Sequence, residues 1–216
     1  MARNGGVRVD RIITRGDFLI DGQSFTVDNN IWLLGDDTEV LVIDAAHDPS
    51  VILAAIDGRH VSVIVATHGH NDHINAAVEL AARVQAPIAL CPADLMLWQA
   101  VYPDRLPDLE LSDGQRLPIA GGGWLHVMHT PGHSPGGVCL YGVIGGEPVL
   151  FSGDTLFRGG PGATGRSFSD FPTILDSIRG RLLTLPPETV VHTGHGDDTT
   201  IGTEALDYDQ WILRGH

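Results

Sequence analysis

The 216-residue chain is 43% hydrophobic and 19% charged, the composition of an ordinary folded protein, so residues 1–216 are expected to form one domain. Acidic residues outnumber basic ones by 27 to 13, and a formal net charge of −14 argues against a nucleic-acid partner. Lysine is absent from the sequence, which excludes lysine Schiff-base chemistry.

No apolar run approaches the length needed to span a bilayer, and the N-terminal sequence lacks the apolar core of a signal peptide. A cytoplasmic protein with no membrane partner is therefore expected. The sequence carries no information on the oligomeric state.

β-Branched apolar runs predict strands along the chain: Val7–Ile13, Ile31–Leu34, Val40–Ile43, Val61–Ala66, Leu125–His129, Val138–Tyr141, Val149–Ser152 and Thr189–His192. Helical periodicity predicts four helices: Ser50–Ile56, Ile74–Val84, Ala93–Val101 and Ile174–Leu183. The strands come first as a meander and then alternate with helices. This order predicts an α/β fold with helices packed outside β-sheets.

The segment THGHNDH, residues 67–73, lies between a predicted strand and a predicted helix. Residues two apart in an extended segment point the same way, so His68 and His70 are expected to reach one metal ion. Asp72 and His73 follow where the chain turns into the helix, and they are expected to face a second ion. One cluster cannot complete two metal sites, so further ligands must come from downstream.

Three downstream residues are candidates for these further ligands. His133 lies in HTPGHSPGG, Asp154 in VLFSGDTLF and His195 in VVHTGHGDD. Each follows a predicted strand and is next to a glycine, which lets the backbone approach an ion closely. Arg158 and Arg166 come soon after Asp154, and either could bind a substrate carboxylate through two hydrogen bonds or could be a surface residue.

The succession of HxHxDH, a GH loop, SGD and GHG resembles the metallo-β-lactamase superfamily. The segments SGDTLF and HTGHGDD are most similar to its glyoxalase II-like branch, the hydroxyacylglutathione hydrolases. The resemblance covers Ile31 to about Thr203. It implies a four-layer αββα sandwich with the active site at one edge of the sheets.

The resemblance also implies the role of each matching residue. His68, His70 and His133 would hold one metal ion, Asp72, His73 and His195 a second, and Asp154 would bridge both. Asp44, in VLVIDAA, matches an aspartate that supports the metal ligands in this family. Two divalent ions are expected, with zinc as the expected metal and iron or manganese as alternatives.

Two such ions lower the pKa of bound water from 15.7 toward about 7 and polarise a carbonyl. A thiol of pKa about 8.5 leaves without a strong general acid. The predicted function is therefore hydrolysis of a thioester of a small thiol, with Asp72 and Asp154 as catalytic residues. Full-length glyoxalase II has a helical C-terminal region, with lysines, that helps bind glutathione. This sequence ends about twenty residues after His195 and has no lysine, so mycothiol is considered beside glutathione.

Other functions stay open on the same sequence. Persulfide dioxygenases of this superfamily look similar and use one iron, held by a His of the first loop, a His like His133 and an Asp like Asp154. β-Lactam hydrolysis is a weaker alternative, because lactamases of this fold generally lack the bridging aspartate. A metal-binding protein without catalytic activity is the remaining class.

Overall fold

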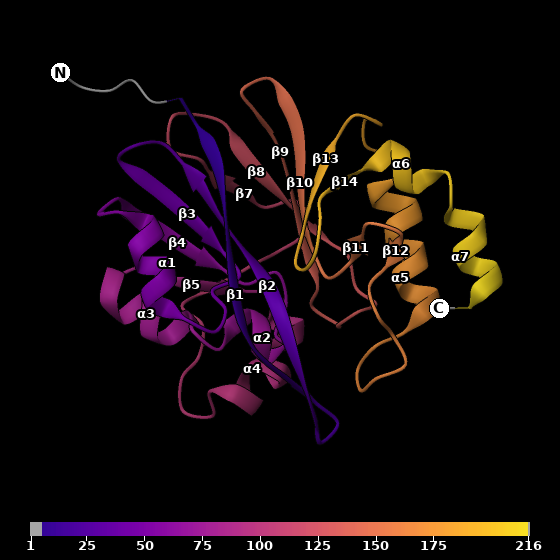
Figure 1. The fold of residues 1–216 in the computed structure, drawn as a ribbon, viewed down its shortest axis with the longest axis horizontal. Helices are drawn as coiled ribbons and strands as arrows, with labels where there is room; N and C mark the ends of the chain where they lie inside the picture. The colour runs from indigo at the N-terminus through magenta and orange to yellow at the C-terminus, as the bar shows by residue number, and fades with distance from the viewer. Residues whose placement is uncertain (1–5, 216) are drawn as a thin grey trace.

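The computed structural model describes residues 6–215, in which two six-stranded β-sheets pack face to face and helices cover both outer sides (Figure 1). This arrangement confirms the predicted αββα sandwich.

The first sheet has the order β1-β2-β3-β4-β5-β6. Its strands are β1 (Arg8–Ile20), β2 (Gln23–Gly35), β3 (Glu39–Ile43), β4 (His60–Val65), β5 (Ile88–Leu90) and β6 (Leu109–Glu110). The first three strands are antiparallel, and the pairs from β3 to β6 are parallel. Parallel neighbours need crossover connections, which here contain α1 (Pro49–Ile56), α2 (Asn71–Ile74), α3 (Ala77–Val84), η1 (Pro92–Asp94) and α4 (Leu95–Val101).

The second sheet has the order β14-β13-β10-β9-β8-β7. Its strands are β7 (Arg116–Pro118), β8 (Trp124–His129), β9 (Val138–Ile144), β10 (Glu147–Gly153), β13 (Val190–Thr193) and β14 (Thr199–Thr200). A separate two-stranded ribbon is formed by β11 (Leu156–Phe157) and β12 (Gly160–Pro161). The helical segments on this side are α5 (Phe171–Ser177), η2 (Ile178–Leu182), α6 (Ile201–Ala205) and α7 (Tyr208–Arg214).

Alternation along β2 shows why the predicted strands read as continuous apolar runs. Ile31 and Leu33 pack in the core between the first sheet and its helices, while Trp32 and Leu34 pack between the two sheets. Both faces of the strand are buried, so both sets of alternating positions must be apolar. A third core lies between the second sheet and its helices and includes the fully buried Trp211.

Three predicted helices differ from the observed ones in their ends or in their continuity. The predicted helix Ile74–Val84 is interrupted between α2 and α3, where the Asn75 side chain accepts the backbone N–H of His47 (2.6 Å). The predicted helix Ala93–Val101 begins with the short 3₁₀ turn η1. The predicted helix Ile174–Leu183 begins at Phe171, after the capping residue Asp170, and continues as the π-helical turn η2.

The first two strands form a hairpin much longer than the predicted Val7–Ile13 and Ile31–Leu34. Their pairing runs without interruption from Arg8↔Gly35 to Ile20↔Gln23, and in Figure 1 the hairpin extends beyond the body of the two sheets. Most side chains near its tip are exposed, so they do not show the apolar alternation that marks a half-buried strand.

The loops that follow β4, β8, β10 and β13 lie close together, because the histidine and aspartate side chains that they carry approach one another. Within residues 6–215, no helix is long and apolar enough to cross a membrane.

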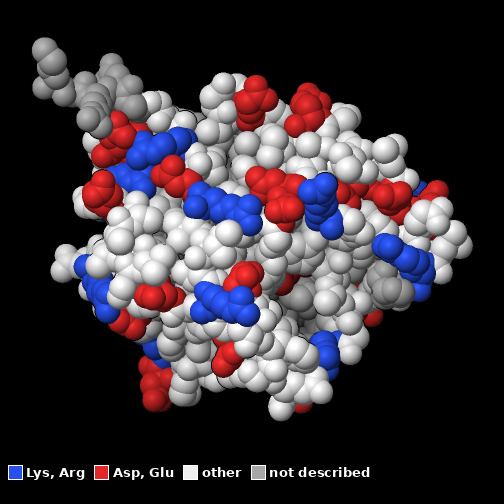
Figure 2. Space-filling model, viewed as in Figure 1, with Lys and Arg blue, Asp and Glu red and all other residues white. Residues whose placement is uncertain are grey.

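On the face shown in Figure 2, arginines and acidic side chains are interspersed. Several arginines form ion pairs, among them Arg8 with Asp37 (2.6 Å).

Candidate metal centre

The THGHNDH loop is shaped by hydrogen bonds at its start and by a helix at its end. Asp44 accepts the backbone N–H of Thr67 (2.7 Å) and the hydroxyl of the same residue (2.8 Å). His70 is extended (φ −65°, ψ 145°) and immediately precedes α2, whose first turn contains Asp72 and His73. The loop therefore changes from extended to helical between the two pairs of predicted ligands, as the sequence pattern predicts.

The structure brings the predicted ligands together in three groups of potential metal-binding atoms. In each group, the ligand atoms lie within 4.8 Å of one another. The groups are His68/His70/His133, His68/His73/Asp154 and Asp72/His73/His195. We call the first group cluster one and the last group cluster two.

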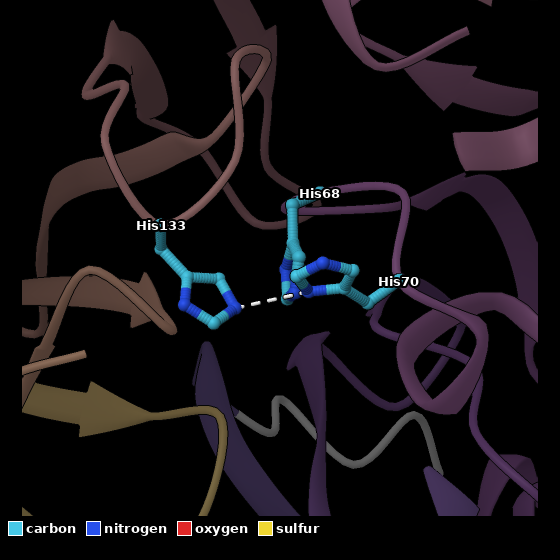
Figure 3. A group of neighbouring side chains, drawn as sticks. All are labelled: His68, His70 and His133. Carbon is cyan, nitrogen blue, oxygen red and sulfur yellow. Dashed lines mark hydrogen bonds between the residues drawn. The ribbon is translucent and has the colours of Figure 1, made fainter. Parts of the chain in front are cut away.

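Cluster one joins loops from the two sheets. His68 and His70 follow β4 of the first sheet, whereas His133 lies between β8 and β9 of the second (Figure 3). The three imidazoles converge, and His70 Nδ1 lies 3.0 Å from His133 Nε2. The face-to-face packing of the sheets thus creates a site that neither loop could form by itself.

Asp154 lies between the two clusters. Its Oδ2 atom is 3.6 Å from His133 Nε2 and 3.4 Å from His195 Nε2, and its Oδ1 atom is 3.3 Å from His73 Nε2. One carboxylate therefore reaches a member of cluster one and two members of cluster two. This is the placement that a bridging ligand requires.

The atoms available at the centre fit a pair of divalent cations. Imidazole nitrogens and carboxylate oxygens suit zinc, iron and manganese. Buried polar atoms in a folded protein normally have hydrogen-bond partners. Among the described residues, the buried atoms of the predicted ligands that have none include His68 Nε2, Asp72 Oδ1 and Asp154 Oδ1. Bound cations would account for such unpartnered acceptors.

Asp44 forms a hydrogen bond with one of the predicted ligands. Its Oδ2 atom accepts a hydrogen bond from His73 Nδ1 (2.9 Å), and both side chains are buried. A proton held on Nδ1 leaves Nε2 free to bind a cation, and it fixes the orientation of the ring. The backbone of Asp44 is left-handed (φ 59°), a conformation that few residues with side chains adopt.

A second set of hydrogen bonds, which begins at His47, supports the ligands of cluster two. Sequence reasoning did not find it. The backbone N–H of His47 can only donate, and it donates to Asn75 Oδ1 (2.6 Å). The amide nitrogen of Asn75 must then face His47 Nδ1 (3.0 Å), which accepts. A neutral imidazole that accepts at Nδ1 carries its proton on Nε2, so Nε2 donates to Asn29 Oδ1 (2.8 Å).

This chain of hydrogen bonds fixes the amide of Asn29. With its oxygen turned to His47, Asn29 directs its Nδ2 group into cluster two, where it donates to Asp72 Oδ2 (3.1 Å). The same nitrogen lies 3.3 Å from His73 Nε2 and 3.5 Å from His195 Nε2. Asn29 is fully buried, so its orientation is set by the protein and not by solvent.

The two clusters differ in electrostatics. Burial lowers the pKa of His70 to about 3 and that of His68 well below its ordinary value, with neighbouring histidines adding to the effect. Burial also acts to lower the pKa of His195, but the carboxylates of Asp154 and Asp72 prevail and raise it to about 10. Carboxylates likewise raise the pKa of His73 well above its ordinary value, against the effect of burial.

Neither predicted substrate-binding arginine lies among the ligands. Arg166 donates to Gln23 Oε1 (2.9 Å) and lies over the Phe25 ring (5.6 Å), so it contacts the β1–β2 hairpin. Arg158 is exposed and pairs with Asp197 at 3.4 Å.

Comparisons with known proteins agree with this geometry. The family model of the metallo-beta-lactamase superfamily matches residues 25–195. Hydroxyacylglutathione hydrolase GloC from Haemophilus influenzae is 31% identical over 191 residues, which cover 81% of this chain and 87% of that protein.

Two solved structures are similar in both sequence and fold. The protein TTHA1623, in a di-iron-bound form, is 34% identical with a TM-score of 0.73, covering 87% of this chain and 96% of that one. ETHE1 from Myxococcus xanthus is 25% identical with a TM-score of 0.67, covering 88% and 80%. The chain therefore belongs to the metallo-β-lactamase superfamily of metal hydrolases.

Proposed function

We propose that this protein is a binuclear metal-dependent thioesterase that hydrolyses S-acyl derivatives of a small thiol. The observation that carries the proposal is the position of Asp154, whose carboxylate reaches His133 of cluster one and His73 and His195 of cluster two. The similarity to a hydroxyacylglutathione hydrolase supports the choice of substrate class.

In this proposal the residues of each cluster would hold one divalent ion, and Asp154 would be shared between the two sites. Two such ions supply a hydroxide nucleophile near neutral pH and stabilise negative charge on a carbonyl oxygen. We propose zinc as the metal, although the same donors suit iron, which the similar protein TTHA1623 contains.

The chain's own residues hold and orient the reactants. Asp72 is buried beside the ligands, and Asn29 donates to its Oδ2 atom, so the carboxylate is held in one rotation. We propose that Asp72 orients the attacking water. The thiolate leaves without a proton donor because a thiol has a pKa of about 8.5.

A cavity of about 200 Å³ beside the centre is a candidate site for the acyl or thiol portion of the substrate. It reaches the loop at His70, and its other sides come from the hairpin tip, α4 and the loop before α5. The lining is largely apolar and includes Leu19, Leu97, Ala100, Val101 and Phe168. This composition suits an uncharged group better than a carboxylate.

The test is an assay of thiol release from S-lactoylglutathione and from simple acyl thiols by the metal-loaded protein. We expect hydrolysis that is lost after chelation and restored by zinc. Asp154→Ala should be inactive, while Asp197→Ala, which changes an exposed aspartate near His195, should keep activity. No hydrolysis of any thioester by protein with two bound ions would contradict the proposal.

A mononuclear-iron persulfide dioxygenase remains the alternative, supported by the similarity to ETHE1. The two functions differ in their need for cluster two. A mononuclear site would use His133, Asp154 and one histidine of the first loop, leaving Asp72 and His195 without a role. Oxygen uptake on a persulfide by protein with one iron, together with an absence of thioesterase activity, would favour this alternative.

A further inference from the structure

Asp94 is a buried carboxylate to which neither the sequence pattern nor the proposed chemistry gives a role. It ends the turn η1, directly before α4, and its relative exposure is 0%. Among residues 6–215, no arginine or histidine forms an ion pair with it. Burying a carboxylate without a cation is costly unless several hydrogen bonds replace its water. The partners of Asp94 therefore matter.

All three hydrogen-bond donors to this carboxylate come from the loops that carry cluster one. Oδ2 accepts the backbone N–H of Gly69 (2.8 Å), the residue between His68 and His70. It also accepts the hydroxyl of Ser134 (2.7 Å), the residue after His133. Oδ1 accepts the backbone N–H of Gly136 in the same second loop. One side chain thus links the two loops that supply the three histidines.

The close approach of both loops to Asp94 depends on glycine. A Cβ atom at Gly69 would lie 2.9 Å from the Asp94 carbonyl oxygen and 3.1 Å from its Cβ. At Gly136, a Cβ atom would lie 2.6 Å from the Asp94 nitrogen and 2.8 Å from its Cγ. Such distances leave no room for a side chain, so the sequence keeps both loops in direct contact with this residue. This close packing is evidence, separate from the hydrogen bonds, that the two loops meet at Asp94.

We propose that Asp94 is a positioning residue that sets the spacing between the His68/His70 loop and the His133 loop, and so sets the metal affinity of cluster one. The two loops come from different sheets, and their imidazoles approach to 3.0 Å between His70 and His133. Without the link, each loop could relax separately. The inference rests on the metal-binding part of the proposed function and is independent of the substrate.

The test compares Asp94→Asn with the wild-type protein. Asparagine keeps the shape but replaces one acceptor oxygen with a donor, which would face an N–H or O–H donor of a metal loop. Altered support of metal ligands typically weakens metal binding about 10- to 100-fold. We expect that loss at cluster one, with little change at cluster two. Zinc affinities would be measured by chelator competition, and the weakened site identified by anomalous diffraction.

Glu204→Gln is the matched control. Glu204 is also a buried carboxylate (2% exposed), and it accepts the backbone N–H of Gly159 (2.9 Å) and the Thr199 hydroxyl (2.5 Å), none of which belongs to a cluster. Replacing the Glu204 carboxylate with an amide should lower the melting temperature without changing the affinity for zinc. If Asp94→Asn does not fold, Ser134→Ala removes one donor and should weaken cluster one by a smaller factor.

Unchanged zinc affinity in both Asp94→Asn and Ser134→Ala, or equal weakening in Glu204→Gln, would overturn the proposal. A wild-type protein that binds no metal would instead overturn the proposed function. The two failures are therefore distinguishable.

Discussion

Clusters one and two both lie against Asp154 but contact different supporting residues. Cluster one consists of three histidines, and the buried carboxylate of Asp94 ties its two loops together. In cluster two, Asp44 and Asn29 hydrogen-bond the ligands directly, to His73 and Asp72. Asp94 thus acts on the loops of the first cluster, whereas Asp44 and Asn29 act on ligand side chains of the second, so substitutions at these residues should affect the two clusters separately.

The electrostatic difference follows from the same composition. Cluster one contains no carboxylate, so burial keeps its His68 and His70 neutral. Cluster two contains Asp72 and lies against Asp154, so His73 and His195 hold protons in the absence of a cation. A cation binding at cluster two must displace those protons, whereas one at cluster one meets His68 and His70 as neutral imidazoles.

Removing the residue shared by both clusters should have the largest effect. We expect Asp154→Ala to lose at least one of two bound ions, because two neighbouring cations lose the carboxylate between them. Turnover should fall by about a thousand-fold or more, since metal assistance contributes several kcal/mol. Metal content and thioester hydrolysis would be measured beside Asp197→Ala. A near wild-type rate with both ions bound would refute the bridging role.

A substitution at Asn29 should break cluster two alone. Asn29→Leu removes the donor to Asp72 and the acceptor for His47, and we expect zinc binding there to weaken about 10- to 100-fold while cluster one is unchanged. Thr14→Val is the control, because Thr14 is buried and pairs with Asn29 across the two strands, but its hydroxyl donates to the Ala46 carbonyl and not to a ligand. Equal weakening at both clusters would show that they are not supported separately.

The pH dependence of metal binding should sharpen the same contrast. The pKa of His195 is raised to about 10, so the metal-free imidazole is protonated at neutral pH and gains affinity for a cation as the pH rises. Affinity at cluster two should therefore fall by about tenfold per pH unit, for each proton displaced, as pH decreases from 8 to 6. His70, with a pKa of about 3, predicts a much flatter profile for cluster one. Calorimetric titration in buffers of different ionisation enthalpy counts the released protons; equal proton release at both sites would contradict this account.

The smallest effect is expected at the two arginines. We propose that Arg158 or Arg166 binds a substrate carboxylate. Replacing the contacting arginine with alanine should lower kcat/KM by about tenfold for a carboxylate-bearing thioester, the effect of one charged hydrogen bond, and leave an uncharged thioester unaffected. If neither variant distinguishes the two substrates, both arginines serve only their contacts with Asp197 and with Gln23 and Phe25.

The layers of the sandwich and the seven candidate ligands could be predicted from the sequence, because the strands and the ligand motifs are local patterns. Strands such as Ile31–Leu34 are apolar on both faces, and each ligand lies in a short motif directly after a strand. The full β1–β2 hairpin was missed because its outer half is exposed. A local signal was nonetheless present, since Asp21-Gly22 is a favoured hairpin turn between Phe18-Leu19-Ile20 and Phe25.

The supports of the two clusters could not be predicted in the same way. Asp94 lies 25 residues from Gly69 and 42 from Gly136, and Asn29 lies 43 from Asp72, so their contacts exist only in the folded sandwich. His47 had no motif around it, and its role depends on the direction of three successive hydrogen bonds. A single sequence contains no pattern for such long-range polar contacts.

The most direct test of a binuclear centre is metal analysis of protein purified without oxygen, combined with a thioesterase assay on the same sample. We expect two divalent ions per chain, one in each cluster, and thiol release from an acyl thiol. One iron per chain, with oxygen consumed on a persulfide and no thiol released from a thioester, would contradict this expectation.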